Sequence, residues 1–114
     1  MLELPYKTAD FTVDAESAKF IENDKLSVKA LTARSCLTTR EMQHFVRTKL
    51  TKNNISSRIK VFCFLATDDK IIDNNKTKKL MDGIGAEIIE YDTSAHSLAL
   101  DVPEMLAKDI ARRI

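Results

Sequence analysis

The chain has 114 residues, enough for one domain but not two. A hydrophobic content of 44% and a charged content of 31% exclude an intrinsically disordered chain, and a net charge of +1 gives no strong field that would favour nucleic acid. The longest apolar run, residues 61–66, is far too short to cross a bilayer.

The N-terminal sequence has neither a basic segment nor an apolar core, so we expect no secretory signal. Of the two cysteines, Cys36 and Cys63, the second lies inside the apolar run and is typical of a small core side chain. These features predict a reducing, cytoplasmic location, with peripheral membrane attachment as the alternative. His44 and His96 lie far apart and no Cys-x-x-Cys occurs, so we expect no metal and no cofactor.

The first half of the chain is predicted to be mostly helical. Residues 1–13 show no clear period and are expected to be irregular. Asp14 is a suitable N-cap for a short helix over residues 15–23. The side chains of that helix expected to face inward are Ala18, Phe20 and Ile21. Residues 24–37 mix apolar and polar positions, and their pattern does not distinguish a helix from a strand.

A longer helix is predicted from Thr38, because Thr38 and Glu41 form a capping-box pattern. The polar pairs at residues 53–54 and 56–57 would end it. His44 is expected on its surface or partly buried. The helix carries an apolar stripe formed by Met42, Phe45, Val46 and Leu50. We expect this stripe to pack against a sheet, with a lipid-binding surface as the alternative.

The second half predicts a β-α-β-α order. Residues 59–66 are β-branched and aromatic and, after Lys60, apolar on both faces, which is typical of a covered strand in a parallel sheet. Asp73 or Asn74 would cap a helix that ends at Gly83 or Gly85. Residues 86–91 form the next predicted strand, and two strands joined by a helix should pair in parallel.

A terminal helix is predicted after the second strand. Asp101 and Glu104 resemble a capping box with the aspartate as the cap, and Pro103 is tolerated in the first turn. The side chains of this helix expected to face inward are Met105, Leu106, Ile110 and Ile114.

An acid and a histidine follow the two predicted strands. Asp69 lies just past Leu65, and His96 just past Tyr91. Because functional loops gather at the carboxyl ends of parallel strands, which lie about 5 Å apart, we expect Asp69 and His96 to touch. The carboxylate would then fix the imidazole, whose other nitrogen could take a proton from a serine hydroxyl. The alternative, which these residues alone do not exclude, is that Asp69 and His96 are ordinary solvated side chains of surface loops.

The surroundings of both residues resemble a known family. Residues 64–73, Phe-Leu-Ala-Thr-Asp-Asp-Lys-Ile-Ile-Asp, resemble the acid loop of the α/β-hydrolases, Gly-x-x-Asp-x-(Ile/Val)-(Val/Ile)-(Asp/Pro). The match puts the triad acid on Asp69, with Ala66 in place of the family's glycine. Residues 91–98 and the following Asp-Val-Pro resemble the family's histidine loop and terminal helix, which puts the catalytic histidine on His96.

The front half looks like the cap-to-core segment of the monoacylglycerol lipase, lysophospholipase and serine aminopeptidase-like branch. Residues 10–12, 20–26 and 32–34 carry this likeness, with Lys25 in place of a proline. The resemblance implies a single partial domain over residues 1–114, the C-terminal β-α-β-α part of an α/β-hydrolase fold with parallel strands. Residues 1–57 would form the helical cap segment, and residues 58–114 the last two strands and helices.

The nucleophile of such an enzyme is missing from this sequence. No Gly-x-Ser-x-Gly occurs, and Ser94 and Ser97, which flank His96, lack a glycine-flanked elbow. The resemblance therefore implies a C-terminal fragment of a serine hydrolase of the carboxylic ester, lysophospholipid or monoacylglycerol type, with Asp69 and His96 as its catalytic residues and inactive alone. Its expected partner is an N-terminal hydrolase half or a second copy, and an acyl substrate would be bound only by the complete enzyme.

Two other interpretations stay open. The chain could be a non-catalytic α/β interaction module, or the product of a decayed gene, that retains the C-terminal half of a hydrolase. A small flavodoxin-like regulator would require at least three further strands, which the front half does not supply.

Overall fold

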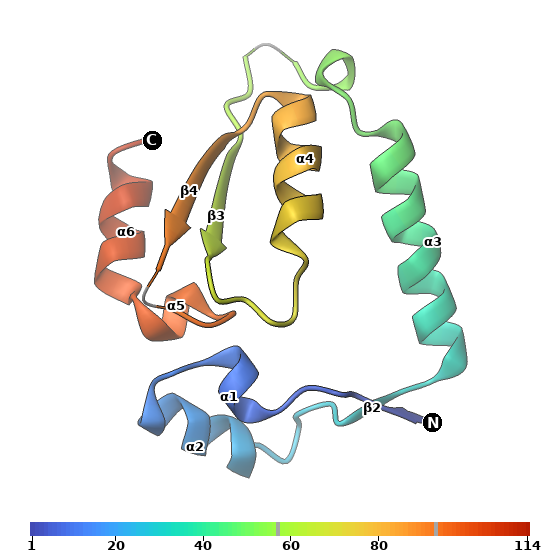
Figure 1. The fold of residues 1–114 in the computed structure, drawn as a ribbon, viewed down its shortest axis with the longest axis vertical. Helices are drawn as coiled ribbons and strands as arrows, with labels where there is room; N and C mark the ends of the chain where they lie inside the picture. The colour runs from blue at the N-terminus through green and yellow to red at the C-terminus, as the bar shows by residue number, and fades with distance from the viewer. Residues whose placement is uncertain (57, 93) are drawn as a thin grey trace.

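The computed structural model describes residues 1–56, 58–92 and 94–114. Its centre is a parallel pair of strands, β3 (Phe62–Ala66) and β4 (Glu87–Tyr91), with Phe62 opposite Glu87 and Ala66 opposite Tyr91. Figure 1 shows α4 (Asn74–Ile84) on one side of this pair and α6 (Pro103–Ala111) on the other. The predicted β-α-β-α order with parallel strands is therefore confirmed, whereas the described residues do not form a complete α/β-hydrolase sheet.

Helix α4 begins and ends where the sequence predicts. The Asp73 side chain accepts a hydrogen bond from the backbone N–H of Lys76, 3.1 Å away, and so caps the first turn. The helix ends at Gly85, whose φ of 75° is left-handed and suits a residue without a Cβ. The crossover between β3 and β4 is thus fixed by local signals at both ends.

The end of the chain differs from the prediction. Asp101 does not cap the terminal helix but belongs to a short helix, α5 (Leu98–Asp101), and α6 follows with Val102 at its N-cap and Pro103 at its first position. The reason is that four donors elsewhere in the fold occupy the Asp101 carboxylate. Leu106 is half-buried as expected, but the predicted inward positions Met105, Ile110 and Ile114 are exposed.

Short elements fill the segment that was expected to be irregular. β1 (Leu2–Glu3) pairs antiparallel with β2 (Ala30–Leu31), and α1 (Thr8–Phe11) forms a single turn. The prediction was wrong over residues 1–13 because elements of two to four residues are too short to show a period. Helix α2 (Ala15–Asn23) is confirmed together with its Asp14 cap.

The inward face predicted for α2 is only partly correct. Ala18 and Ile21 are half-buried, but the side chain of Phe20 is exposed to 74%. The spacing of apolar residues indicates which side chains share a face, but it does not show whether another element covers that face.

Helix α3 (Ala33–Lys49) begins earlier than predicted. The Thr32 side chain accepts a hydrogen bond from the backbone N–H of Ser35, 3.1 Å away, so the cap lies at Thr32 and Thr38 lies inside the helix. A short 3-10 helix, η1 (Lys52–Asn54), follows. Position 57, one of those expected to end the helix, lies outside the described residues.

The apolar stripe of α3 does not pack against the sheet. Met42 and Phe45 are each exposed to 64%, Val46 is also exposed, and only Leu50 is half-buried. His44 is exposed on the same helix, as predicted. Figure 1 shows α3 apart from the β3–β4 pair, joining the N-terminal helices to the start of β3. The expected packing of this stripe is therefore wrong for the described residues.

The buried core is small, and most of it lies at the carboxyl ends of the strands, whereas Ile84 lies near the start of β4. Its apolar members are Leu65, Ala66, Ile84, Tyr91, Ala95 and Val102. The first three residues of β3 are only half-buried, and its last two are buried. The prediction of a strand covered on both faces is therefore correct only for the carboxyl end of β3. Cys63 is one of these half-buried residues, and both it and Cys36 are free.

The chain exposes more surface than a compact protein of its size. The accessible area is 8962 Å², against about 6,300 Å² for a folded monomer of this mass. The radius of gyration is 16.1 Å, against about 13 Å for a compact domain of this length. No helix in the described part of the chain is long and apolar enough to span a membrane.

Candidate acid–histidine site

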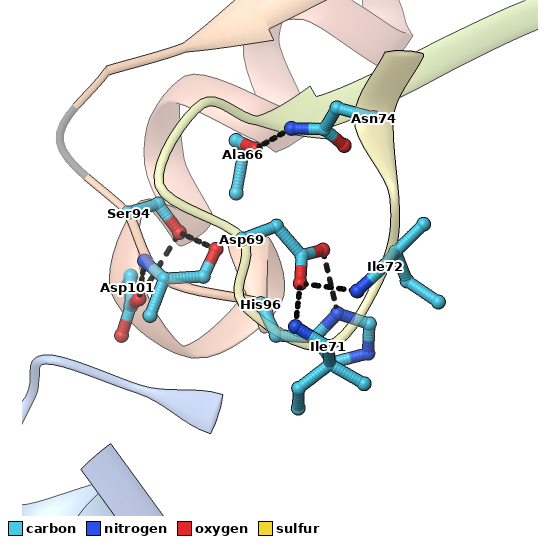
Figure 2. A network of polar contacts seen from close by, with 9 residues as sticks. Ala66, Asp69, Ile71, Ile72, Asn74, Ser94, His96 and Asp101 are labelled. Carbon is cyan, nitrogen blue, oxygen red and sulfur yellow. Dashed lines mark hydrogen bonds and ion pairs between the residues drawn. The ribbon is translucent and has the colours of Figure 1, made fainter. Parts of the chain in front are cut away.

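Asp69 and His96 meet beyond the carboxyl ends of β3 and β4. The Nδ1 atom of His96 lies 2.8 Å from Oδ2 of Asp69. Asp69 belongs to the loop between β3 and α4, and His96 to the loop between β4 and α5 (Figure 2). Ala66 and Tyr91 are paired at the ends of the two strands, so both loops start from the same edge of the sheet. The expected contact between the acid and the histidine is thus present.

The loop of Asp69 is folded around its own carboxylate. The Oδ1 atom accepts hydrogen bonds from the backbone N–H groups of Ile71 and Ile72, at 2.8 and 2.9 Å. The side-chain amide of Asn74 donates to the carbonyl oxygen of Ala66, 2.7 Å away, and ties the start of α4 to the end of β3. These bonds, drawn in Figure 2, leave Oδ2 of Asp69 directed at His96.

The environment of Asp69 keeps it ionised. Its side chain is exposed to only 6%, and this burial, the largest single influence, acts to raise its pKa. The hydrogen bonds from His96, Ile72 and Ile71 together outweigh burial and hold the pKa below its ordinary value of 3.8. At neutral pH the carboxylate is therefore charged and can only accept hydrogen bonds.

An ionised Asp69 determines which nitrogen of His96 carries the proton. Because a carboxylate cannot donate, Nδ1 of His96 must donate to it, and in the neutral ring Nε2 then has a free lone pair. The His96 side chain is exposed to 33%. Asp69 would also stabilise the imidazolium that forms when Nε2 accepts a proton, so the pair is arranged as a general base.

The loop of His96 is held by the N-terminal segment. The backbone N–H of Ser97 donates to the carbonyl oxygen of Phe11, 2.7 Å away. The rings of Phe11 and His96 meet edge to face with their centroids 6.1 Å apart. Nothing in the sequence pattern links residue 11 to residue 96, and this neighbour of the histidine was not predicted.

A second carboxylate, that of Asp101, is hydrogen-bonded to the loop that carries His96. Its Oδ2 atom accepts from the backbone N–H of Ala95 at 2.8 Å and from the hydroxyl of Ser94 at 3.0 Å (Figure 2). Its Oδ1 atom accepts from the hydroxyl of Thr12 and from the backbone N–H of Val13. The sequence pattern predicts Asp101 as a helix cap, and this second role was not predicted because a cap and a buried acceptor present the same local pattern.

The two serines beside His96 differ in their surroundings. Ser94 is exposed to only 2%, and its hydroxyl bonds to Asp101 and lies 3.2 Å from the carbonyl oxygen of Ala95. Ser97 is the N-cap residue of α5. Across the described residues, no side-chain hydroxyl or thiol is hydrogen-bonded to Nε2 of His96. The contacts of Ser94 agree with the expectation that it is not the nucleophile, whereas the position of Ser97 does not test that expectation.

An open cleft of about 420 Å³ lies at the same end of the sheet. It is lined by Ala9, Asp10, Val13, Asp68, Lys70, Asp92, Ser94 and Ala95. His96 does not line it, so the cleft is not by itself a substrate pocket for the pair. No group of three or more His, Cys, Asp or Glu side chains able to hold a metal ion occurs in the described part of the chain.

None of the protein-family models, curated proteins or solved structures compared with this chain matches it.

Proposed function

We propose that this chain supplies the acid and the histidine of a serine-hydrolase triad, and that a separate polypeptide segment supplies the serine. The observation that supports this most strongly is the 2.8 Å contact between Nδ1 of His96 and Oδ2 of Asp69. In this role Nε2 of His96 takes the proton of the serine hydroxyl and later delivers it to the leaving group, while Asp69 stabilises the imidazolium. The proposed fold is correspondingly the C-terminal part of an α/β-hydrolase, with β3 and β4 as its last two strands.

The proposed substrates are carboxylic esters of the lysophospholipid or monoacylglycerol type. This class is suggested by the resemblance of residues 10–12, 20–26 and 32–34 to the cap-to-core segment of that branch. The geometry of the pair supports acyl transfer in general, and the acyl chain that is accepted would be set by the segment that completes the site.

An unpaired strand edge supports the proposed partner. Strand β3 is paired only with β4 among the described strands, so its other edge offers unpaired backbone groups. The surface in excess of a compact monomer is about 2,600 Å². With an equal area on the partner, the interface would bury about 5,200 Å² in total, which is at the upper end of the range for obligate interfaces. We propose that an N-terminal hydrolase half, carrying the Gly-x-Ser-x-Gly elbow and the oxyanion-hole donors, pairs along the β3 edge and covers the exposed stripe of α3.

The first experiment reads the coding sequence directly upstream of Met1 and co-expresses any frame there that encodes Gly-x-Ser-x-Gly with this chain. We expect the two polypeptides to co-purify and to hydrolyse a short-chain nitrophenyl ester. His96→Gln should abolish hydrolysis and leave co-purification intact, whereas His44→Gln, at the exposed histidine of α3, should change neither. Self-association is the competing outcome, and a stable homodimer that excludes the upstream product would contradict the proposed partner.

A non-catalytic interaction module is the second candidate, and the exposed apolar stripe of α3 favours it as much as it favours a split enzyme. The two candidates differ in their dependence on Asp69 and His96. If a complex with the upstream product forms but hydrolyses no ester, and Asp69→Asn and His96→Gln leave the properties of that complex unchanged, then the interaction module is the correct assignment.

A further inference from the structure

The carboxylate of Asp101 joins two segments that lie far apart in the sequence. One oxygen accepts from Thr12 and Val13 at the start of the chain, and the other accepts from Ser94 and Ala95 in the histidine loop. Thr12 and Ser94 are each exposed to only 2%, so their two hydroxyl bonds to Asp101 are shielded from water.

The same two segments are joined again on the other side of His96. The backbone N–H of Ser97 donates to the carbonyl oxygen of Phe11, and the Phe11 ring stands edge-on to the imidazole. The histidine is thus held between Ala95, which bonds to Asp101, and Ser97, which bonds to Phe11. Two tethers on neighbouring residues leave the His96 backbone little freedom to rotate.

The Asp101 site is built for a charged acceptor and not for a neutral amide. Burial, the largest single influence, acts to raise the pKa of Asp101, but its donors Thr12, Ala95, Ser94 and Val13 together hold that pKa below its ordinary value of 3.8. All four partners act as donors to one carboxylate. An asparagine in its place would turn an NH₂ group towards one backbone N–H and one hydroxyl. The backbone N–H would lose its acceptor, and the hydroxyl would have to turn from donor to acceptor.

We propose that Asp101 is a positioning residue, which clamps the His96 loop against residues 11–13 and thereby holds the imidazole on Asp69. Asp101 makes no contact with the imidazole, so it acts through Ala95 and Ser94. The catalytic meaning of this inference rests on the proposed function, but the geometric claim does not.

The test is an NMR measurement on the full chain with ¹⁵N-labelled histidine, which needs no activity. The His44→Gln variant removes the ring signals of His44 and so identifies the signals that belong to His96. In the wild type we expect His96 to show the Nδ1-protonated tautomer and a ring proton protected from exchange with water. In Asp101→Asn we expect that protection to fall at least tenfold and the tautomer preference to weaken. These signals report the ring contact with Asp69, which a general loss of stability does not change while the protein stays folded.

Asp109→Asn is the matched control. Asp109 is a carboxylate that accepts from the Tyr91 hydroxyl at 2.7 Å and pairs with Arg113, away from the His96 loop. This variant should lose stability but keep the His96 signals. If Asp101→Asn keeps the His96 signals as fully as Asp109→Asn does, the inference is wrong.

Two milder variants keep the inference testable if Asp101→Asn does not fold. Thr12→Val and Ser94→Ala each remove one side-chain donor to Asp101. Each should reduce the exchange protection of the His96 ring, and unchanged protection in both would overturn the inference. Failure of the proposed function would be seen separately, as altered His96 signals in these variants together with no ester hydrolysis by any complex of the chain.

Discussion

Asp69 and His96 are 27 positions apart in the chain, yet Oδ2 of one lies 2.8 Å from Nδ1 of the other. Each residue sits in a loop that leaves the carboxyl end of a strand, and the two strands are paired in parallel with Ala66 opposite Tyr91. The register of the strands therefore sets the contact between the acid and the histidine.

The chain by itself should not hydrolyse esters. It has no Gly-x-Ser-x-Gly, and the hydroxyl of Ser94 is buried and bonded to Asp101. A short-chain nitrophenyl ester incubated with the purified chain should release nitrophenol at the rate measured for His96→Ala. A clearly faster rate in the wild type, lost in His96→Ala, would show that the chain carries its own nucleophile.

Asp69→Asn should leave the loop folded but present the wrong tautomer of the histidine. An asparagine oxygen can still accept from the N–H groups of Ile71 and Ile72, while its NH₂ group then faces Nδ1 of His96. In the reconstituted enzyme we expect kcat to fall by about 10⁴-fold. The measurement is steady-state hydrolysis of the nitrophenyl ester, and a loss below tenfold would argue against Asp69 as the triad acid.

The predicted features of the fold are those that local signals determine. Asp73 and Gly85 define the ends of α4 through a side-chain cap and a left-handed residue, and both were predicted. The contact between Asp69 and His96 was predicted because the geometry of a parallel pair brings its two carboxyl-end loops together.

The features that were missed depend on long-range contacts or on competing caps. Thr32 and Thr38 both carry cap signals, and only the folded chain shows that the first is used. The position of Asp101 depends on Thr12, which is 89 residues away. The spacing of Met42 and Phe45 predicts a shared face, but it cannot show that the described residues leave that face uncovered.

Stability should fall at acid pH through Asp69 and Asp101. Both carboxyl groups have folded-state pKa values below 3.8, against about 3.9 in the unfolded chain. Their contribution is therefore fully present above about pH 5 and is lost as the pH falls below about 4, through the folded pKa values. Urea unfolding between pH 7 and pH 3 measures this, and the double variant Asp69→Asn/Asp101→Asn should show a flatter profile over the acid part of that range.

The two glycines of the chain should respond to alanine in opposite directions. Gly85 has a φ of 75°, and an added Cβ would meet only the Lys52 side chain at 3.7 Å, so the cost is backbone strain of about 1–2 kcal/mol. Gly83 lies inside α4 with nothing within 4 Å of an added Cβ, so alanine there should stabilise by up to about 1 kcal/mol. Urea unfolding of both variants is the check, and equal shifts would contradict the assigned helix end.

The most direct test of the central claim is labelling of the reconstituted complex with a fluorophosphonate, which phosphonylates a serine that a histidine has activated and releases fluoride. We expect label on the Gly-x-Ser-x-Gly partner in the presence of the wild-type chain. Little or no label should appear with His96→Gln, although that variant still binds the partner. Equal labelling with wild type and His96→Gln would show that His96 does not activate the serine and would contradict the proposal.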